Sequence, residues 1–178
     1  YTVIDPESVL ITHLSETLMQ HAHELLTRED VQQLLERLRK IQPSLVGDVV
    51  PEMVSVGLVQ RVLQNLLREG VSIRDLPLIL EALGEHGGRT KNAALLTECA
   101  RKALCRTITE QYKRPDGKIY VIGLDPSLEH PLIQTVQQGA DAISLAVPPE
   151  MAVQLNQGLA DAWKAAMDKG IEEVAVLC

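Results

Sequence analysis

The feature that most constrains the fold is a change in hydrophobic periodicity near residue 112. Before it, apolar residues recur three and four positions apart, as in Leu76, Ile79, Leu80 and Leu83, which is the spacing of helices that bury one face. After it, residues 119–124 form a nearly unbroken apolar run, typical of a strand buried on both faces. We therefore expect an α+β fold: an N-terminal helical bundle followed by a small α/β subdomain with a short parallel or mixed sheet.

Capping residues and glycines divide the first part of the chain into successive helices. Asp5, Thr27 and Asn92 each precede a helical stripe and can accept hydrogen bonds from free N–H groups. Gly70 follows another stripe, at a position where helices commonly end in a left-handed residue. The expected helices cover residues 5–25, 27–42, 58–69, 75–84 and 92–111, with shorter segments at 44–48 and 49–56. Because the connections are short, these helices should pack into a compact bundle.

Apolar runs and helix starts alternate in the last third of the chain. The candidate strands are residues 119–124, 142–147 and 174–178, and helices are expected to begin at Asp125-Pro126 and at Pro148-Pro149. The order β-α-β-α-β favours a small parallel or mixed sheet with helices packed on it. The chain begins at Tyr1 and ends inside an apolar run, so we expect it to be a piece of a longer protein, truncated within its last sheet.

Composition excludes several classes of protein. The net charge is −7 and aromatic residues make up 2% of the chain, which disfavours proteins that wrap phosphates or stack bases. Three cysteines are too few for a disulfide scaffold, and no run approaches the roughly 18 apolar residues of a membrane span. The hydrophobic fraction of 46% rules out wholesale disorder. We therefore expect a folded protein that binds no nucleic acid.

No constellation of side chains predicts catalysis. The chain has neither a Walker-type loop nor a GxGxxG turn after a strand, and a helix end explains Gly84, Gly87 and Gly88 better than a phosphate cradle does. His21 and His23 are two residues apart, so on a helix they point about 200° away from each other. His21 lies on an apolar stripe, which favours a place in the core or in an interface. We expect no enzyme, no catalytic residue, no metal and no cofactor.

Two alternatives remain open on the residues alone. Asp125 follows a predicted strand, where α/β folds often bind ligands, so the chain could be a small α/β nucleotide-binding or hydrolase module, although helix capping explains Asp125 better. Arg61, Arg68 and Arg74 on a helix pair could instead serve a helical DNA-binding regulator, against which the net charge argues. A nucleotide would raise the melting temperature in the first case, and duplex binding would be salt-sensitive in the second.

Several runs of sequence are more specific than their periodicity. They are HAHELL (21–26), VQQLLERL (31–38), VLQNLL (62–67) and VSIRDL (71–76), with VIDP (3–6) and THL (12–14) near the start. Together these runs resemble the export-gate family of type III secretion, the FHIPEP family, and in particular its flagellar, FlhA-type branch. The resemblance is carried mainly by residues 3–111 and is looser over residues 118–125.

The resemblance implies a domain organisation and a function. Residues 1–26 would be a helix from the preceding subdomain, residues 27–112 a helical subdomain, and residues 117–178 a small α/β subdomain truncated at its C-terminus. The chain would be part of the cytoplasmic region of a bacterial inner-membrane protein, and would reach the membrane only through a more N-terminal region. Nine such regions would form a ring, a nonameric homo-oligomer. This ring would be a docking platform for protein transport in flagellum biogenesis, and would contact export chaperones with bound cargo and other components of the export apparatus.

Two groups of candidate site residues follow. Thr12 matches the threonine of the family's chaperone-docking cleft, and Val9 is its weaker neighbour. Because the resemblance places most of that cleft in subdomains absent from this chain, it implies that the chain alone binds chaperones poorly. Asn65, Arg74 and Asp75 are polar motif residues in apolar surroundings. For these three residues, capping and buried hydrogen bonding that brace the bundle are favoured over direct contact at an interface.

Overall fold

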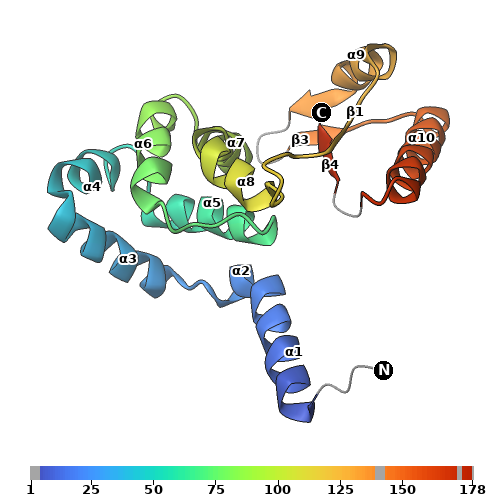
Figure 1. Cartoon of the computed structure of the whole chain (residues 1–178). Helices are drawn as coiled ribbons and strands as arrows, with labels where there is room; N and C mark the ends of the chain where they lie inside the picture. The colour runs from blue at the N-terminus through green and yellow to red at the C-terminus, as the bar shows by residue number, and fades with distance from the viewer. Residues whose placement is uncertain (1–4, 139–142, 172–173, 178) are drawn as a thin grey trace. The chain divides into compact units, whose positions relative to one another are not determined.

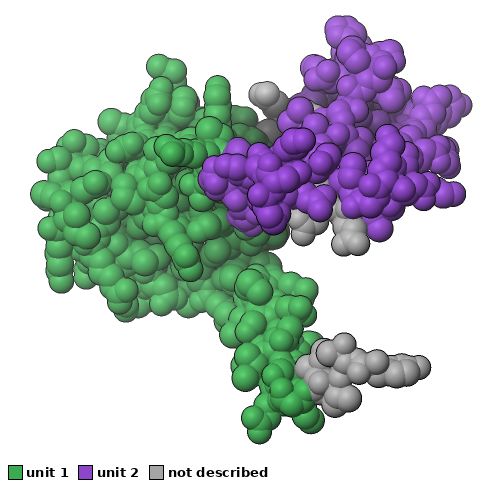
Figure 2. Space-filling model, viewed as in Figure 1, with its two compact units in different colours: residues 1–108 green, residues 109–178 purple. Residues whose placement is uncertain are grey.

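The computed structural model describes residues 5–138, 143–171 and 174–177. The described chain is mostly helical and carries two small sheets, which confirms the expected α+β class (Figure 1). It divides into two compact units, which we term unit 1 (residues 1–108) and unit 2 (residues 109–178) (Figure 2). Within the described residues, every strand belongs to unit 2.

Unit 1 is built from helices joined by short turns. In chain order these are α1 (Pro6–Gln20), α2 (Ala22–Leu25), α3 (Arg28–Ile41), α4 (Pro43–Val49), α5 (Val56–Arg68), α6 (Leu76–Gly87), α7 (Ala93–Ala103) and α8 (Cys105–Tyr112), which continues into unit 2. α6 packs against α4 and α7, and α5 packs against α2, α3 and α7. α5 therefore lies at the centre of the contacts in this unit.

The buried core of unit 1 consists of aliphatic side chains. α5 buries the stripe expected from its spacing, Leu58, Val59, Val62, Leu63 and Leu66. The other helices and the turns contribute Val31, Leu35, Leu38, Val46, Val49, Val50, Val54, Val71, Leu76, Ile79, Leu80, Leu83, Leu96, Ala100 and Leu104. Full burial of a leucine or valine side chain contributes about 1.5–3 kcal/mol, so this cluster is the main source of stability in unit 1.

Side-chain caps begin the helices at predicted positions. The Asp5 carboxylate accepts a hydrogen bond from the Ser8 N–H at 2.9 Å, and Asn92 caps α7 in the same way. At the start of α3, Thr27 Oγ1 accepts from the Asp30 N–H at 3.2 Å, and the Asp30 carboxylate accepts from the Thr27 N–H at 2.9 Å. These bonds satisfy N–H groups that have no partner inside the helix.

Two helices predicted as continuous are interrupted in the structure. The expected helix 5–25 is broken at His21, and the expected helix 92–111 is broken at Leu104. Leu104 is fully buried, and the turn there brings both Leu104 and Ile108 against the core. The prediction of unbroken helices was wrong because tertiary packing overrides local helical preference at these two positions.

Gly84 and Gly87 allow α6 to approach the preceding segment closely. A Cβ atom on Gly84 would lie 2.8 Å from Val49 Cγ2, and one on Gly87 would lie 2.6 Å from Val54 Cγ1. Val49 and Val54 are buried and β-branched, so neither side chain can turn aside easily. These glycines therefore form a contact surface within α6, in addition to their place near its end.

Unit 2 contains two separate two-stranded sheets. β1 (Val121–Gly123) pairs in parallel with β4 (Ala175–Leu177), and β2 (Val136–Gln138) pairs antiparallel with β3 (Ile143–Leu145). α9 (Pro126–Gln134) follows β1, and α10 (Pro149–Asp168) precedes β4. As expected, Asp125 caps α9 by accepting from the Ser127 N–H at 2.9 Å, and Gly170 follows α10 with a φ of 73°.

The strands of unit 2 differ from their prediction in two respects. β2, which begins at Val136, is not among the strands expected from the sequence, because a three-residue strand beside a helix end carries too little periodicity to be recognised. The run 119–124 predicts a strand buried on both faces, but Val121 is 52% exposed. Among the described residues, β1 pairs with one strand only, β4, and no described residue of unit 2 is classed as buried. Val121 therefore lies in a strand that is open to solvent.

Replacing Gly87 with alanine should destabilise unit 1 by about 1–3 kcal/mol. The new Cβ would overlap Val54 Cγ1 and would also lie 3.4 Å from the Met53 carbonyl oxygen. Gly88→Ala is the matched control, because no atom lies within 4 Å of its Cβ position and its φ of −70° suits alanine. Urea unfolding followed by circular dichroism measures both variants, and equal midpoints would contradict the close contact.

The capping box of α3 should make stability depend on pH. Hydrogen bonds from the Thr27 side chain and backbone lower the pKa of Asp30. The contribution of Asp30 is therefore present above its unfolded-state pKa of about 4 and is lost as the pH falls through the lower folded-state pKa. The difference in denaturation midpoint between the wild type and Asp30→Ala should shrink below about pH 4.

Glu29→Ala is the control for this pH series, because Glu29 lies in the same first turn without a part in the capping box. The difference in denaturation midpoint between the wild type and Glu29→Ala should change much less with pH. A midpoint difference for Asp30→Ala that stays constant down to the lowest pH at which the chain remains folded would refute the role of the ionised carboxylate.

Candidate functional site

The first group of candidate residues lies on α1, a fully exposed helix. Every side chain from residue 6 to residue 20 is exposed, and Val9 exposes 54% of its surface. Thr12 follows Val9 by three residues, so the two side chains point within about 60° of each other. They form one surface, which we term the Thr12 face.

The opposite side of α1 is a stripe of leucines. Leu10, Leu14 and Leu18 recur every four residues and are 67%, 55% and 49% exposed. Thr12 is two residues away from both Leu10 and Leu14, so it points about 160° away from each of them. Large exposed apolar side chains gathered on one 15-residue helix are typical of a surface that is covered by another part of a protein or by a partner.

His21 and His23 lie at the junction of α1 and α2. His21 is exposed at the break between the helices and is not in the core, and its Nδ1 lies 3.1 Å from Glu24 Oε1. This hydrogen bond, together with the charge interaction between the two groups, lowers the pKa of Glu24. His23 is the more buried of the two, with a side chain 18% exposed. The break at His21 shifts the phase of the helix, so the continuous stripe did not predict which histidine is the less exposed.

Two amide side chains of α5 hold the chain where α2 ends. Gln60 Nε2 and Gln64 Nε2 donate hydrogen bonds to the Leu26 carbonyl oxygen at 3.0 and 3.1 Å. Because a carbonyl oxygen has two lone pairs, both donors can be accepted at once. We term this arrangement the Leu26 clamp. It joins residues 34 and 38 positions apart, so no local pattern in the sequence could have indicated it.

Asn65 connects α5 to α7. Its Nδ2 donates to Thr97 Oγ1 at 3.1 Å, and Thr97 Oγ1 donates in turn to the Ala93 carbonyl oxygen at 2.7 Å. Thr97 is 2% exposed, so its hydroxyl would cost stability if it were left without partners. This pairing accounts for a polar residue at position 65 within the bundle itself.

Arg74 and Asp75 lie at the start of α6. Asp75 Oδ1 accepts a hydrogen bond from the Leu78 N–H at 3.4 Å and caps the helix. The Arg74 backbone N–H donates to Ser72 Oγ at 3.4 Å, whereas its side chain is exposed and makes no hydrogen bond or ion pair with another described residue. The two neighbours therefore differ in role: the Asp75 side chain caps α6, whereas the Arg74 side chain takes no part in a hydrogen bond or ion pair within the described chain.

Within the described residues, the structure assembles no set of groups suited to catalysis. Asp125 Oδ1 accepts from the Ser127 hydroxyl and N–H at 2.5 and 2.9 Å, and these bonds lower the pKa of Asp125. No three His, Cys, Asp or Glu side chains are placed to hold a metal ion in this part of the chain. No described helix is both long enough and apolar enough to cross a membrane.

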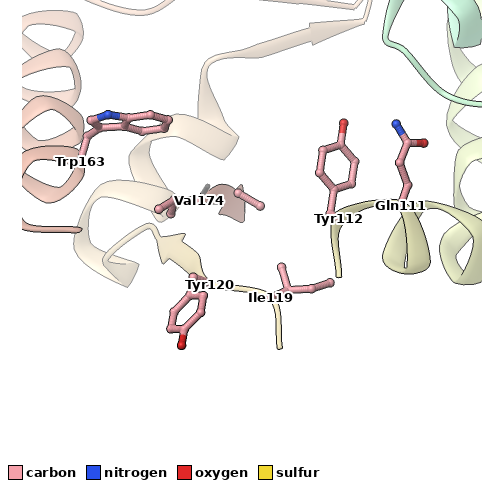
Figure 3. A pocket seen from close by; sticks show the side chains of 7 residues that line it. Gln111, Tyr112, Ile119, Tyr120, Trp163 and Val174 are labelled. Atoms are coloured by element: carbon pink, nitrogen blue, oxygen red, sulfur yellow. The ribbon is translucent and has the colours of Figure 1, made fainter. Parts of the chain in front are cut away.

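Unit 2 carries a groove and a pocket with different linings. The groove, of about 470 Å³, is lined by Leu124, Glu129, Leu132, Ile133, Val136, Leu145, Val147, Leu155, Asn156, Leu159 and Val176. The pocket, of about 420 Å³, is lined by Gln111, Tyr112, Ile119, Tyr120, Trp163, Val174 and Ala175 (Figure 3). Neither was expected from the sequence. The pocket is lined by three aromatic side chains, whereas the groove is lined by none.

The chain is similar to flagellar biosynthesis proteins. It matches the FHIPEP family over residues 1–178. The flagellar biosynthesis protein FlhA of Bacillus subtilis (strain 168) is 39% identical over 160 residues, which cover 90% of this chain and 24% of that protein. FlhA of Escherichia coli (strain K12) is 44% identical over 139 residues, which cover 78% of this chain and 20% of that protein. The chain therefore spans a quarter or less of the length of these relatives.

The fold is shared with solved structures. A chain of the Chlamydia pneumoniae CdsV and CdsO protein complex superposes with a TM-score of 0.79 at 27% identity, over 89% of this chain and 46% of that one. Nonameric SctV-C from EPEC superposes with a TM-score of 0.74 at 23% identity, over 92% of this chain and 56% of that one. At 23% identity the second match establishes a common fold alone.

Removing the Leu26 clamp should destabilise unit 1 cooperatively. Gln60→Ala or Gln64→Ala leaves one donor on the carbonyl and should cost about 0.5–1 kcal/mol, whereas the double variant leaves the carbonyl unpaired and should cost more than the sum. Gln33→Ala, exposed on α3, is the control and should be neutral. Urea unfolding measures all four variants. Strictly additive single effects would show that the two amides act independently.

Proposed function

The chain belongs to the FHIPEP family, and on this premise we propose that it is part of the docking platform of a flagellar type III protein export gate. Its similarity to FlhA-type and SctV-type export-gate proteins supports the coarser assignment to protein export. The finer role that we propose is contact with export chaperones carrying cargo and with other components of the export apparatus. In this role the chain acts by binding, without an enzymatic step.

The observation that carries the proposal is the exposure of two opposite sides of α1. The leucine stripe would pack against the remainder of the subdomain to which α1 belongs. The Thr12 face would then remain open as one wall of a docking cleft. Thr12 and Val9 offer a partner an apolar surface and one hydroxyl group, a mixture typical of protein interfaces.

We further propose the arrangement of the chain within the complete protein. Residues 1–26 would belong to the preceding subdomain, residues 27–112 to the helical subdomain and residues 117–178 to the small α/β subdomain. The separation of residues 109–178 into a unit of their own supports the last boundary. Nine copies would form a ring on the cytoplasmic side of the bacterial inner membrane, by analogy with nonameric SctV-C from EPEC.

We assign different roles to the three polar motif residues. Asn65 and Asp75 would brace the bundle, through Thr97 and through the start of α6 respectively. Arg74, whose side chain makes no hydrogen bond or ion pair within the described chain, would contact a neighbouring subunit or another export component.

Titration of a flagellar chaperone–cargo complex tests the docking role. The complete cytoplasmic region should bind the complex, whereas the 178-residue chain contributes only α1 to the cleft and should bind at least about tenfold more weakly. Isothermal titration calorimetry measures both affinities. Equal affinities would place the cleft elsewhere, and no binding by the complete region would refute the docking role.

The Thr12 face can be tested in the complete cytoplasmic region. Thr12→Asp should weaken chaperone binding about tenfold, because it introduces a charge that must lose water in the interface. Thr109→Asp is the matched control: it makes the same change at an exposed threonine of another helix, α8, outside both the Thr12 face and the leucine stripe. Circular dichroism verifies that both variants fold. An equal loss of affinity in the two variants would show that α1 contributes no specific face.

A further inference from the structure

Unit 1 has a surface hollow of its own, which is lined by two cations and by no acidic residue. It has a volume of about 420 Å³ and lies between the α4–α5 connection, the first turns of α5 and the loop between α6 and α7. Its charged lining residues are Arg61 and Lys91, and we term it the cation pocket. In a chain with a net charge of −7, a lining charge of +2 without an acid beside it requires an explanation.

Lys91 is a positive charge that the fold holds in place. Its Nζ donates hydrogen bonds to the carbonyl oxygens of Met53 and Gly87, the second at 2.7 Å. A carbonyl group has no net charge, so these bonds position the ammonium group without neutralising it. Because an ammonium group has three protons, one donor remains for a ligand. Lys91 makes no ion pair with another described residue.

Arg61 supplies the second charge. Its side chain is exposed and makes no hydrogen bond or ion pair within the described chain. Glu52 lies between Pro51 and Met53 in the sequence, but it does not line the pocket and forms no ion pair with either cation among the described residues. A guanidinium group presents its N–H donors in a planar fork that matches the two oxygens of a carboxylate.

The other walls of the cation pocket are partly apolar. Pro51, Met53 and Leu58 lie beside the cations in its lining, and Met53 is 40% exposed. Gly57, in the first turn of α5, also lines the pocket, and the start of a helix adds to the positive potential. A small inorganic anion would leave the apolar walls uncovered, whereas a carboxylate beside an apolar side chain would meet both parts of the lining.

We propose that the cation pocket binds a carboxylate side chain of a partner protein, in a short segment that places apolar residues next to the carboxylate. The Arg61 fork would hold both oxygens, and the remaining Lys91 proton would approach one of them. Charge complementarity between the lining and the carboxylate selects this occupant. The proposal does not depend on the docking role of α1, because the pocket shares no residue with that helix.

Nuclear magnetic resonance can test the proposal on the isotope-labelled 178-residue chain. The chain is titrated with the peptide acetyl-Ser-Leu-Glu-Met-Ser-amide and with a control peptide in which glutamine replaces the glutamate. We expect saturable shifts of the Arg61 Nε–H and Gly57 N–H resonances with the first peptide. The affinity for the second should be at least about tenfold lower, because glutamine keeps the shape and removes the charge. Salt should weaken binding of the first peptide.

Variants separate the cation pocket from the general charge of unit 1. Arg61→Gln should weaken binding of the glutamate peptide about tenfold. Arg61→Lys, which keeps the charge and removes the planar fork, should lie between Arg61→Gln and the wild type. Arg89→Gln is the matched control, because Arg89 is exposed in the same loop as Lys91 and lies outside the pocket lining. It should bind as the wild type does. Circular dichroism verifies that each variant is folded.

Several outcomes would overturn the proposal. Absence of saturable shifts would show that the pocket does not bind this peptide, and equal affinity for the glutamine peptide would show that it does not recognise the carboxylate. Equal losses in Arg61→Gln and Arg89→Gln would reduce the effect to overall charge. Inorganic phosphate that competes with the peptide at equal concentration would identify a general anion site. Shifts that appear on raising the protein concentration alone would show that the occupant is a second copy of the chain.

Discussion

The hydrogen bonds from Gln60 and Gln64 to the Leu26 carbonyl fix the point at which the N-terminal helices leave the bundle. Immediately after this point, the capping box of Thr27 and Asp30 begins α3. Side chains therefore satisfy the backbone on both sides of a short connection, where neither helix can do so. α1 has no buried residue, so the segment that carries the Thr12 face is held to unit 1 through this connection, by the two hydrogen bonds to the Leu26 carbonyl and by the partly buried Leu26 side chain, which packs against the core.

The two units obtain their order in different ways. Every buried residue of the described chain lies between Val31 and Leu104, within unit 1. Unit 2 has three-residue strands paired two by two, and isolated two-stranded pairs are marginal in water. Its apolar groove and aromatic pocket are surfaces whose burial by a partner would add stability. Unit 1, with its buried core, offers fixed surfaces, whereas unit 2, which buries few side chains, would gain more stability from association with a partner.

The features that the sequence predicts well are those that depend on residues close together in the chain. The caps at Asp5, Thr27 and Asn92 and the stripe of α6 depend on neighbours at most four positions away, and each was predicted at its position. The break at Leu104 and the lower exposure of His23 relative to His21 depend on packing between distant helices. Local periodicity cannot represent such packing. Of the candidate site, Thr12 was identified through resemblance alone, and the Leu26 clamp and the aromatic pocket were missed because each joins residues far apart in the chain.

The separation of the aromatic residues gives the two units different optical signatures. Tyr112, Tyr120 and Trp163 all lie in unit 2, while the buried core of unit 1 contains no ring. Near-ultraviolet absorption and indole emission therefore report mainly on unit 2, and the far-ultraviolet dichroism of the helices is dominated by unit 1. A thermal scan recorded in both spectral regions distinguishes a single cooperative transition from two successive ones, without labels and without cutting the chain.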